Sequence, residues 1–130
     1  MVGKVGEKLA ALELQARGWT VLGRNFRAPK GGEVDLVCRG GETLEELVFV
    51  EVKTRSREDF GRPLEAVGRK KQALLRRGAA EWLKLLRKGR RQAAWEGEEK
   101  IPYRFDVVEV ILKEGERPKV TLVENVFQER

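Results

Sequence analysis

The sequence contains no histidine and a single cysteine, Cys38, among its 130 residues. One cysteine cannot form an internal disulfide, and without histidine it cannot complete a common structural zinc site. The absence of histidine also excludes the Ser-His-Asp and Cys-His nucleophile systems. Any catalysis must therefore use carboxylates, lysines or a hard metal ion, and Cys38 is expected to be a small core residue.

Long apolar segments are missing as well. No run approaches the roughly 20 residues that a membrane-spanning helix needs, and the first residues alternate charges with alanine and leucine, unlike a secretory signal. A chain of 130 residues suits one domain, because a second core would leave each half too small to bury enough apolar surface. We therefore expect a single cytoplasmic domain, residues 1–130, that does not associate with membranes.

The basic residues are concentrated in the middle of the chain. Residues 53–91 carry 14 Lys or Arg against four Asp or Glu, a net charge of +10, whereas the whole protein has a net charge of +6. A solvated amphipathic helix would explain this composition without any ligand. Its position directly after a charged strand favours a surface for a polyanion such as nucleic acid.

Periodicity predicts an α/β protein with the element order α-β-β-β-α-β-β, a mixed sheet with helices packed on it. Residues 3–17 are a predicted helix, since Val5, Leu9, Leu12 and Ala16 recur at helical spacing, with Gly3, Glu7, Ala10 and Leu14 on another, narrower face. Residues 19–55 are predicted to form an antiparallel meander of three strands. A long basic helix is predicted to follow and to end near Gly89, before a mobile loop at 88–101 and two strands at 103–113 and 119–127.

Charged residues interrupt two of the predicted apolar strands. Because side chains alternate across a strand, Glu51 and Lys53 share one face with Phe49, opposite the valines at 48, 50 and 52. The same parity in the preceding strand joins Glu33 and Asp35 on one face, opposite Val34 and Leu36. We therefore expect three carboxylates and a lysine to meet on a common face of the sheet.

Two interpretations of this cluster remain open at this point. On an exposed sheet face, Glu51 and Lys53 would make surface ion pairs worth about 0–1 kcal/mol. Charges within a run of valine and phenylalanine are instead typical of paired, metal-bound or functional groups. An all-oxygen cluster such as Asp35 with Glu51 suits Mg²⁺ or Mn²⁺, and a nearby lysine can orient the attacking water in phosphodiester hydrolysis.

Several motifs together resemble a known family. They are "GEKLAALELQARGW" at 6–19, "GGEVDLV" at 31–37, "VFVEVKTRS" at 48–56, "FG" at 60–61 and "RFDVVEV" at 104–110. Over nearly the whole chain they resemble the bacterial YraN-type family of uncharacterised proteins. Within it, the D…ExK arrangement resembles the PD-(D/E)xK restriction-endonuclease-like nucleases, and the early helical glutamate is similar to that of archaeal Holliday junction resolvases. The resemblance implies a restriction-endonuclease-like mixed sheet and a DNA endonuclease of repair or recombination.

The resemblance also implies roles for individual residues. Asp35 and Glu51 match the metal-binding carboxylates, with the main-chain carbonyl of Val52 as a further ligand of Mg²⁺ or Mn²⁺. Lys53 matches the catalytic lysine. Glu7 matches the acidic residue that completes the metal or water site, although a glutamate in a first helical turn is also favoured by the helix dipole.

Residues outside this motif have simpler expected roles. We expect phosphates to be bound by the basic residues Arg55, Arg57, Arg69, Lys70 and Lys71. Asp106 is expected to pair with Arg104 or Tyr103 rather than with a metal ion. The acidic insertion "GGETLEEL" at 40–47 is expected to point away from the cleft, since it would repel phosphate.

Three functions compete on this sequence. The first is a metal-dependent endonuclease acting on DNA, including branched or four-way junctions, which would cut symmetrically as a homodimer. The second is a catalytically silent nucleic-acid-binding accessory protein with a nuclease fold. The third is an interaction module whose basic helix docks an acidic protein. The apolar residues Val123, Val126 and Phe127 near the C-terminus could form a dimer interface or belong to the core.

Overall fold

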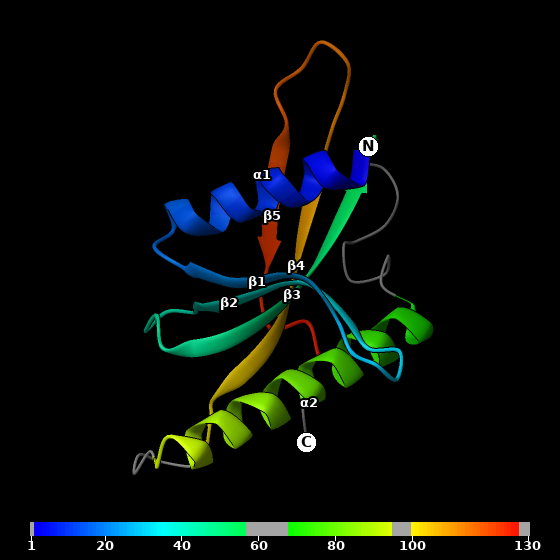
Figure 1. The fold of residues 1–130 in the computed structure, drawn as a ribbon. Helices are drawn as coiled ribbons and strands as arrows, with labels where there is room; N and C mark the ends of the chain where they lie inside the picture. Colours follow the sequence, from blue (N-terminus) through cyan, green and yellow to red (C-terminus); the bar gives the residue numbers. More distant parts are fainter. Residues whose placement is uncertain (1, 57–67, 95–99, 128–130) are drawn as a thin grey trace.

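The computed structural model describes residues 2–56, 68–94 and 100–127, and its element order confirms the α-β-β-β-α-β-β prediction (Figure 1). The elements are α1 (Val2–Ala16), β1 (Thr20–Arg27), β2 (Glu33–Gly40), β3 (Glu46–Arg55), α2 (Arg69–Gln92), β4 (Tyr103–Ile111) and β5 (Lys119–Val123). None of the described helices is both long enough and apolar enough to cross a membrane.

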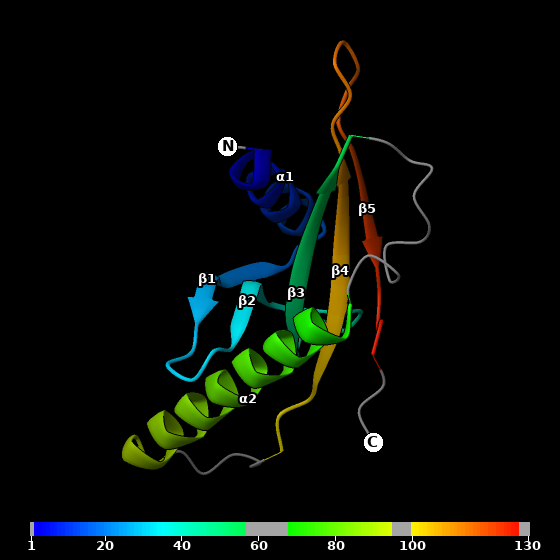
Figure 2. The same cartoon turned by 90° about the vertical axis from the view of Figure 1, so that its right-hand side faces the viewer.

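The five strands form one mixed sheet in the order β1-β2-β3-β4-β5. Strands β1, β2 and β3 make the expected antiparallel meander, β3 and β4 are parallel, and β4 and β5 are antiparallel. A parallel pair needs a long crossover connection. Helix α2 lies within the crossover between β3 and β4, which is why this basic helix packs against the sheet (Figure 2).

The sheet buries a separate side-chain cluster under each helix. The α2 cluster contains Val34, Val37, Leu47, Phe49, Leu75, Ala79, Leu83, Ile101, Phe105, Val107 and Phe127. The α1 cluster contains Ala10, Ala11, Leu14, Trp19, Leu36, Cys38, Val48, Val50, Val108 and Val110. Phe49 lies in the first cluster and Val48 and Val50 in the second, so the predicted alternation of β3 is confirmed. The buried position of Cys38 is confirmed as well.

The narrower of the two faces of α1 is the one buried against the sheet. Val5 and Leu12 are 47% and 54% exposed, whereas Ala10 and Leu14 are completely buried. The reason is the close approach of the helix to the sheet, because a Cβ atom on Gly6 would overlap the side-chain hydroxyl of Thr54 in β3. Gly6 and Ala10 permit this distance, so the stripe with Val5 and Leu12 faces outward.

The predicted alternation fails at the start of β2. Val34 packs in the α2 cluster and Leu36 in the α1 cluster, although both were expected on one face. Regular pairing of β2 with β3 stops at Leu36 opposite Val50. The ladder with β1 continues to Val34 and Glu33, so the change of face occurs where β2 is paired on one side only.

Two element boundaries differ from the prediction. Helix α2 continues through Gly89 to Gln92, so the first residues of the predicted loop are helical. Arg90 and Arg91 in the last turn favour this extension, since cations stabilise a helix C-terminus. Strand β5 ends at Val123, and Phe127 then packs on Phe105 as part of the core. The C-terminal apolar residues therefore have a role inside the protein.

Candidate active site between the diverging strands

The candidate site begins where β2 and β3 stop pairing. Beyond the last backbone pair, Oδ2 of Asp35 accepts a hydrogen bond from the backbone N–H of Val52 at 2.8 Å. The carboxylate thus takes the position of a neighbouring strand's carbonyl. In an extended strand the N–H and C=O of one residue point to the same neighbour. The Val52 carbonyl is therefore directed to the same side as Asp35, as its predicted role requires.

A cavity of about 500 Å³ opens at this divergence. Its lining comes from α1, from the adjoining ends of β2 and β3, and from the first turn of α2. The lining residues are Gly3, Glu7, Asp35, Glu51, Val52, Lys53, Thr54 and Lys71. All four residues expected from the motif comparison to carry side-chain chemistry, Glu7, Asp35, Glu51 and Lys53, line this single cavity.

Glu51 is the most strongly perturbed group of the site. It is 5% exposed, and its Oε1 lies 3.5 Å from Nζ of Lys71. Its Oε2 is buried without a hydrogen-bond partner among the described residues. Burial and the nearby negative charge of Asp35 raise the pKa of Glu51 from 4.5 to about 8, against the opposing effect of Lys71. A hydrogen bond with the carboxyl of Asp35 also raises this pKa, and apart from that acidic group the described residues offer Oε2 no partner.

Lys71 is the lysine that contacts this carboxylate. Its ammonium also lies 3.5 Å from Oε2 of Glu33, so it bridges two acidic side chains. Burial disfavours its charge, but the carboxylates of Glu51, Asp35 and Glu33 outweigh this effect and raise the pKa of Lys71. It stays positively charged and compensates part of the negative charge of the site.

Lys53 lines the same cavity but differs from Lys71 in its contacts. It is partly buried, and among the described residues no ion pair or hydrogen bond involves its ammonium. The two lysines therefore differ in whether their ammonium groups are already engaged by carboxylates of the protein. Lys71 is held by carboxylates of the protein, whereas Lys53 can contact a ligand in the cavity without first breaking such an ion pair.

Glu7 reaches the cavity because Gly6 lets the start of α1 approach β3. It does not, however, join Asp35 and Glu51 in a tight cluster. Within residues 2–56, 68–94 and 100–127, no three acidic, cysteine or histidine side chains gather closely enough to hold a metal ion. Glu7 is thus placed at the cavity wall, at a position suited to contact water or substrate.

The available donors nevertheless fit a hard divalent cation. They are the second oxygen of Asp35, the unpartnered Oε2 of Glu51 and the carbonyl of Val52. All are oxygen atoms, and Mg²⁺ usually binds one or two protein carboxylates and keeps several waters. A cation between Asp35 and Glu51 would also remove the repulsion that raises the pKa of Glu51.

The expected phosphate contacts occupy different environments. Arg69 and Lys70 are exposed at the start of α2, directly before Lys71. The side chain of Arg55 is 10% exposed, and its Nε lies 3.3 Å from Oε2 of Glu109. It is therefore engaged inside the protein and poorly placed for phosphate. Arg57 lies outside the described residues.

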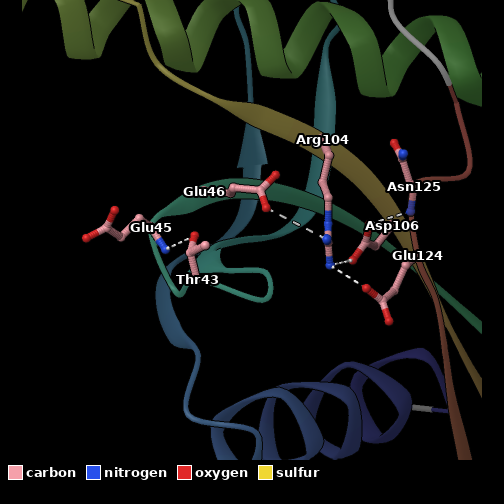
Figure 3. Close-up of polar contacts among 7 residues, drawn as sticks. All are labelled: Thr43, Glu45, Glu46, Arg104, Asp106, Glu124 and Asn125. Atoms are coloured by element: carbon pink, nitrogen blue, oxygen red, sulfur yellow. Dashed lines mark hydrogen bonds and ion pairs between the residues drawn. The ribbon is translucent and has the colours of Figure 1, made fainter. Parts of the chain in front are cut away.

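Asp106 lies opposite Val50 of β3 and belongs to a separate charged network that extends through Arg104 to Glu46 at the start of that strand (Figure 3). It is completely buried, and it accepts hydrogen bonds from Arg104 at 3.0 Å and from the backbone N–H of Asn125 at 2.8 Å. Arg104 also contacts Glu124 at 3.1 Å. The predicted pairing of Asp106 with Arg104 is confirmed, and the aspartate has a structural role.

The acidic insertion lies near this network, away from the cavity. Figure 3 shows Thr43 and Glu45 on the turn that joins β2 to β3, with Glu46 directed toward Arg104. The cavity lies at the opposite end of this strand pair, beyond Leu36 and Val50. The prediction that this insertion points away from the cleft is confirmed.

Comparison with known proteins assigns the family. The sequence profile of the uncharacterised protein family UPF0102 matches residues 6–110. This chain belongs to that family. It is the YraN family that the motifs predicted, and the match spans every described residue of the cavity except Gly3.

Individual relatives agree with this assignment. A UPF0102 protein of Acidothermus cellulolyticus is 40% identical over 126 residues, which cover 97% of this chain and 92% of the relative. A UPF0102 protein of Geobacter sulfurreducens is 38% identical over 128 residues, with 98% and 89% coverage. A third, from Beutenbergia cavernae, is 57% identical over 82 residues, which cover 63% of this chain and 66% of the relative.

In this UPF0102 chain, the strand pattern alone missed the contact between Lys71 and Glu51. Strand parity could not reveal it, because Lys71 comes from a helix that begins 18 residues later. A signal was nevertheless present. Lys71 lies four residues before Leu75 and seven before Gly78, on the helix face that is buried against the sheet. A lysine on such a face needs a carboxylate partner.

Proposed function

We propose that this protein is a Mg²⁺- or Mn²⁺-dependent endonuclease that hydrolyses phosphodiester bonds of DNA. The observation that carries the proposal is the buried, unpartnered Oε2 of Glu51 beside Asp35, in a cavity that also contains two lysines. Burying a carboxylate without a partner is unfavourable. A site of this kind gains stability when a cation is bound, which is the arrangement expected for a metal-dependent nuclease.

Each residue has a distinct role in this proposal. Asp35, Glu51 and the Val52 carbonyl would hold the ion, which when bound supplies a more acidic water and neutralises charge on the phosphate. Lys53, which has no partner in the described structure, contacts the non-bridging phosphate oxygen or the attacking water. Lys71 orients Glu51 through their ion pair. Glu7 accepts a hydrogen bond from water at the cavity wall.

The substrate is held by cations at the mouth of the cavity. Arg69 and Lys70 are exposed two residues and one residue before Lys71, so their side chains can reach phosphates that flank the bond to be cleaved. These contacts carry no sequence information. DNA structure is therefore the expected basis of selectivity, and branched or four-way DNA is the first substrate class to test, in agreement with a role in repair or recombination.

One observation favours a second candidate, a catalytically silent DNA-binding accessory protein. Lys71 already compensates Glu51, and no third carboxylate joins Asp35 and Glu51 among the described residues. A site that has lost its reaction could keep this ion pair for stability alone. Such a protein would bind nucleic acid with strong salt dependence, which also separates it from an interaction module for acidic proteins.

The deciding experiment incubates the purified protein with linear duplex, single-stranded, flap and four-way DNA, with EDTA, Mg²⁺ or Mn²⁺. Wild-type protein is expected to give metal-dependent products, and Asp35→Asn and Lys53→Ala to lose them. Glu42→Gln and Arg117→Ala are matched controls, since both residues are exposed and remote from the cavity. Absence of product from every substrate, or equal cleavage by the cavity variants, overturns the catalytic proposal.

Metal binding has its own measurement. Titration calorimetry with Mn²⁺ is expected to show one site per chain in the wild-type protein and none in Asp35→Asn. Binding of DNA without any Mn²⁺ site or product would support the accessory function instead.

A further inference from the structure

The outer face of α2 carries a continuous row of cations. The face toward the sheet contains Leu75, Gly78, Ala79 and Leu83, all buried. On the opposite face, beyond Arg69 and Lys70, the exposed cations are Arg77, Lys84, Arg87, Lys88 and Arg91. We call these seven residues the α2 cation row. The residues between them on this face are alanines at 73 and 80 and the partly buried Leu74 and Glu81, so a single acidic side chain lies within the row.

The cation row is long, and little negative charge interrupts it. Lys70, Arg77, Lys84 and Arg91 recur every seven residues, which is about 10.5 Å along a helix. The 24 residues of α2 span about 36 Å. Glu81 is the only acidic residue in the helix, and it is partly buried. A small anion would use one or two of these cations, whereas their regular spacing suits a polymer of negative charges.

The row starts at the cavity and extends in one direction from it. Lys71, in the first turn of α2, lines the cavity, while Arg91 lies in the last turn. Figure 2 shows α2 starting beside β3 and β4 and running past β2. A ligand that follows the row therefore passes the cavity only near one end of its contact with the protein.

We propose that the α2 cation row is the contact surface for the phosphate backbone of double-stranded nucleic acid that extends to one side of the cleavage position. The placement of the cleaved bond rests on the proposed function. A length of about 36 Å corresponds to about 10 base pairs at 3.4 Å per pair. The substrate class is a polynucleotide with a duplex arm of at least this length, rather than a dinucleotide or a short single strand.

The alternative partners fit the helix less well. A helix that lies on a lipid surface presents an apolar face beside its cations. Here that face is covered by the sheet, and Leu85 is the single large apolar side chain of α2 that is at least half exposed. An acidic protein segment would also need carboxylates spaced over the full length of the helix, whereas a nucleic acid provides regular charge in any sequence.

The test measures duplex binding in EDTA, so that it does not depend on cleavage. The variant Arg77→Ala/Lys84→Ala/Arg91→Ala removes three cations of the row. The matched control Lys8→Ala/Arg117→Ala/Lys119→Ala removes three exposed cations from α1 and from the segment around the β4–β5 turn. All six positions are exposed, and thermal unfolding of both variants checks that the fold is retained.

Binding to a 20-base-pair duplex is expected to weaken at least tenfold in the row variant. The slope of log K against log salt should decrease by about 2.7, since each phosphate contact contributes about 0.9. The control should keep the wild-type slope. Equal losses in the two variants, or an unchanged slope in the row variant, overturn the proposal.

The two proposals fail separately. If the row variant loses binding and the wild-type protein gives no metal-dependent product, the proposed contact surface is supported and the proposed nuclease activity is rejected. The one-sided contact is tested by attaching a photo-crosslinker to Ala80→Cys, since Cys38 is buried and Ala80 is exposed in the middle of the row. Crosslinks are expected within about 10 base pairs on one side of the junction in a four-way substrate. Crosslinks distributed equally on both sides overturn the one-sided placement.

Discussion

Replacement of Glu51 by glutamine is expected to stabilise the protein at high pH. The pKa of Glu51 is raised to about 8 because the group is buried and lies beside Asp35. The folded state therefore holds a proton that the unfolded state releases near pH 4.5. Stability from this group is fully present below pH 4.5 and decreases as the pH rises toward about 8. Glutamine imitates the protonated carboxyl and does not titrate.

The size of the effect follows from the difference in pKa. At about 1.4 kcal/mol per pH unit, the interval from 4.5 to about 8 gives at most about 5 kcal/mol. The pKa of about 8 already includes the opposing effect of Lys71, and glutamine reproduces the contacts of the protonated carboxyl only in part. We therefore expect the unfolding free energy of Glu51→Gln to exceed that of the wild type by about 2–4 kcal/mol at pH 9, and by little at pH 4.5.

Urea denaturation followed by circular dichroism between pH 4.5 and 9 measures this difference directly, with Glu42→Gln as an exposed control. Mn²⁺ at 100 times its Kd should add about 2.7 kcal/mol to the wild type at pH 8 and nothing to Glu51→Gln. A difference between the two proteins that does not change with pH would refute the burial and charge argument for Glu51.

Three further predictions concern the fold. Leu14→Ala should destabilise the protein by about 2–5 kcal/mol, whereas Leu12→Ala should change its stability by less than about 1 kcal/mol because this leucine is 54% exposed; urea denaturation compares the two. Asp106→Ala should lower the unfolding free energy by about 3–5 kcal/mol, since it leaves the buried guanidinium of Arg104 without its closest partner. Thermal unfolding measures this loss, and a smaller loss would contradict the structural role of Asp106. Gly6→Ala should lower the unfolding free energy by about 1–3 kcal/mol, because the new methyl group overlaps a side chain of β3; an unchanged melting temperature would contradict the close approach of α1.

The order of the elements was predictable because period and turn chemistry agreed along most of the chain. Alternation in β3 placed Glu51 correctly, and the glycine-rich turns marked the meander. Helix α1 was harder, because two of its faces carry apolar residues. The pattern does not decide between them, whereas the distance between helix and sheet selects the face with Gly6, Ala10 and Leu14. That distance is a property of the packed structure.

The site was predictable where it depends on neighbouring strands and less so where it depends on a helix. Asp35 and Glu51 each follow directly beyond the last pair of β2 and β3, Leu36 opposite Val50, and the sequence constrains this pairing through its turn. Lys71 reaches Glu51 from α2, and its placement needs the crossover angle of that helix. Arg55 was expected to contact phosphate, but its partner Glu109 lies on β4, which becomes a neighbour of β3 through the parallel pairing.

Asp35 shows how the fold and the proposed chemistry constrain each other. One of its carboxylate oxygens accepts the Val52 N–H where the strand ladder ends, so only the other remains for a cation. Asparagine keeps an acceptor for this backbone bond but removes the charge, whereas alanine removes both and leaves the N–H at the divergence without its partner. If Asp35→Asn loses metal binding at an unchanged melting temperature, the loss is due to the missing charge alone. The same loss in Asp35→Ala could result either from the missing charge or from local unfolding at the broken backbone bond.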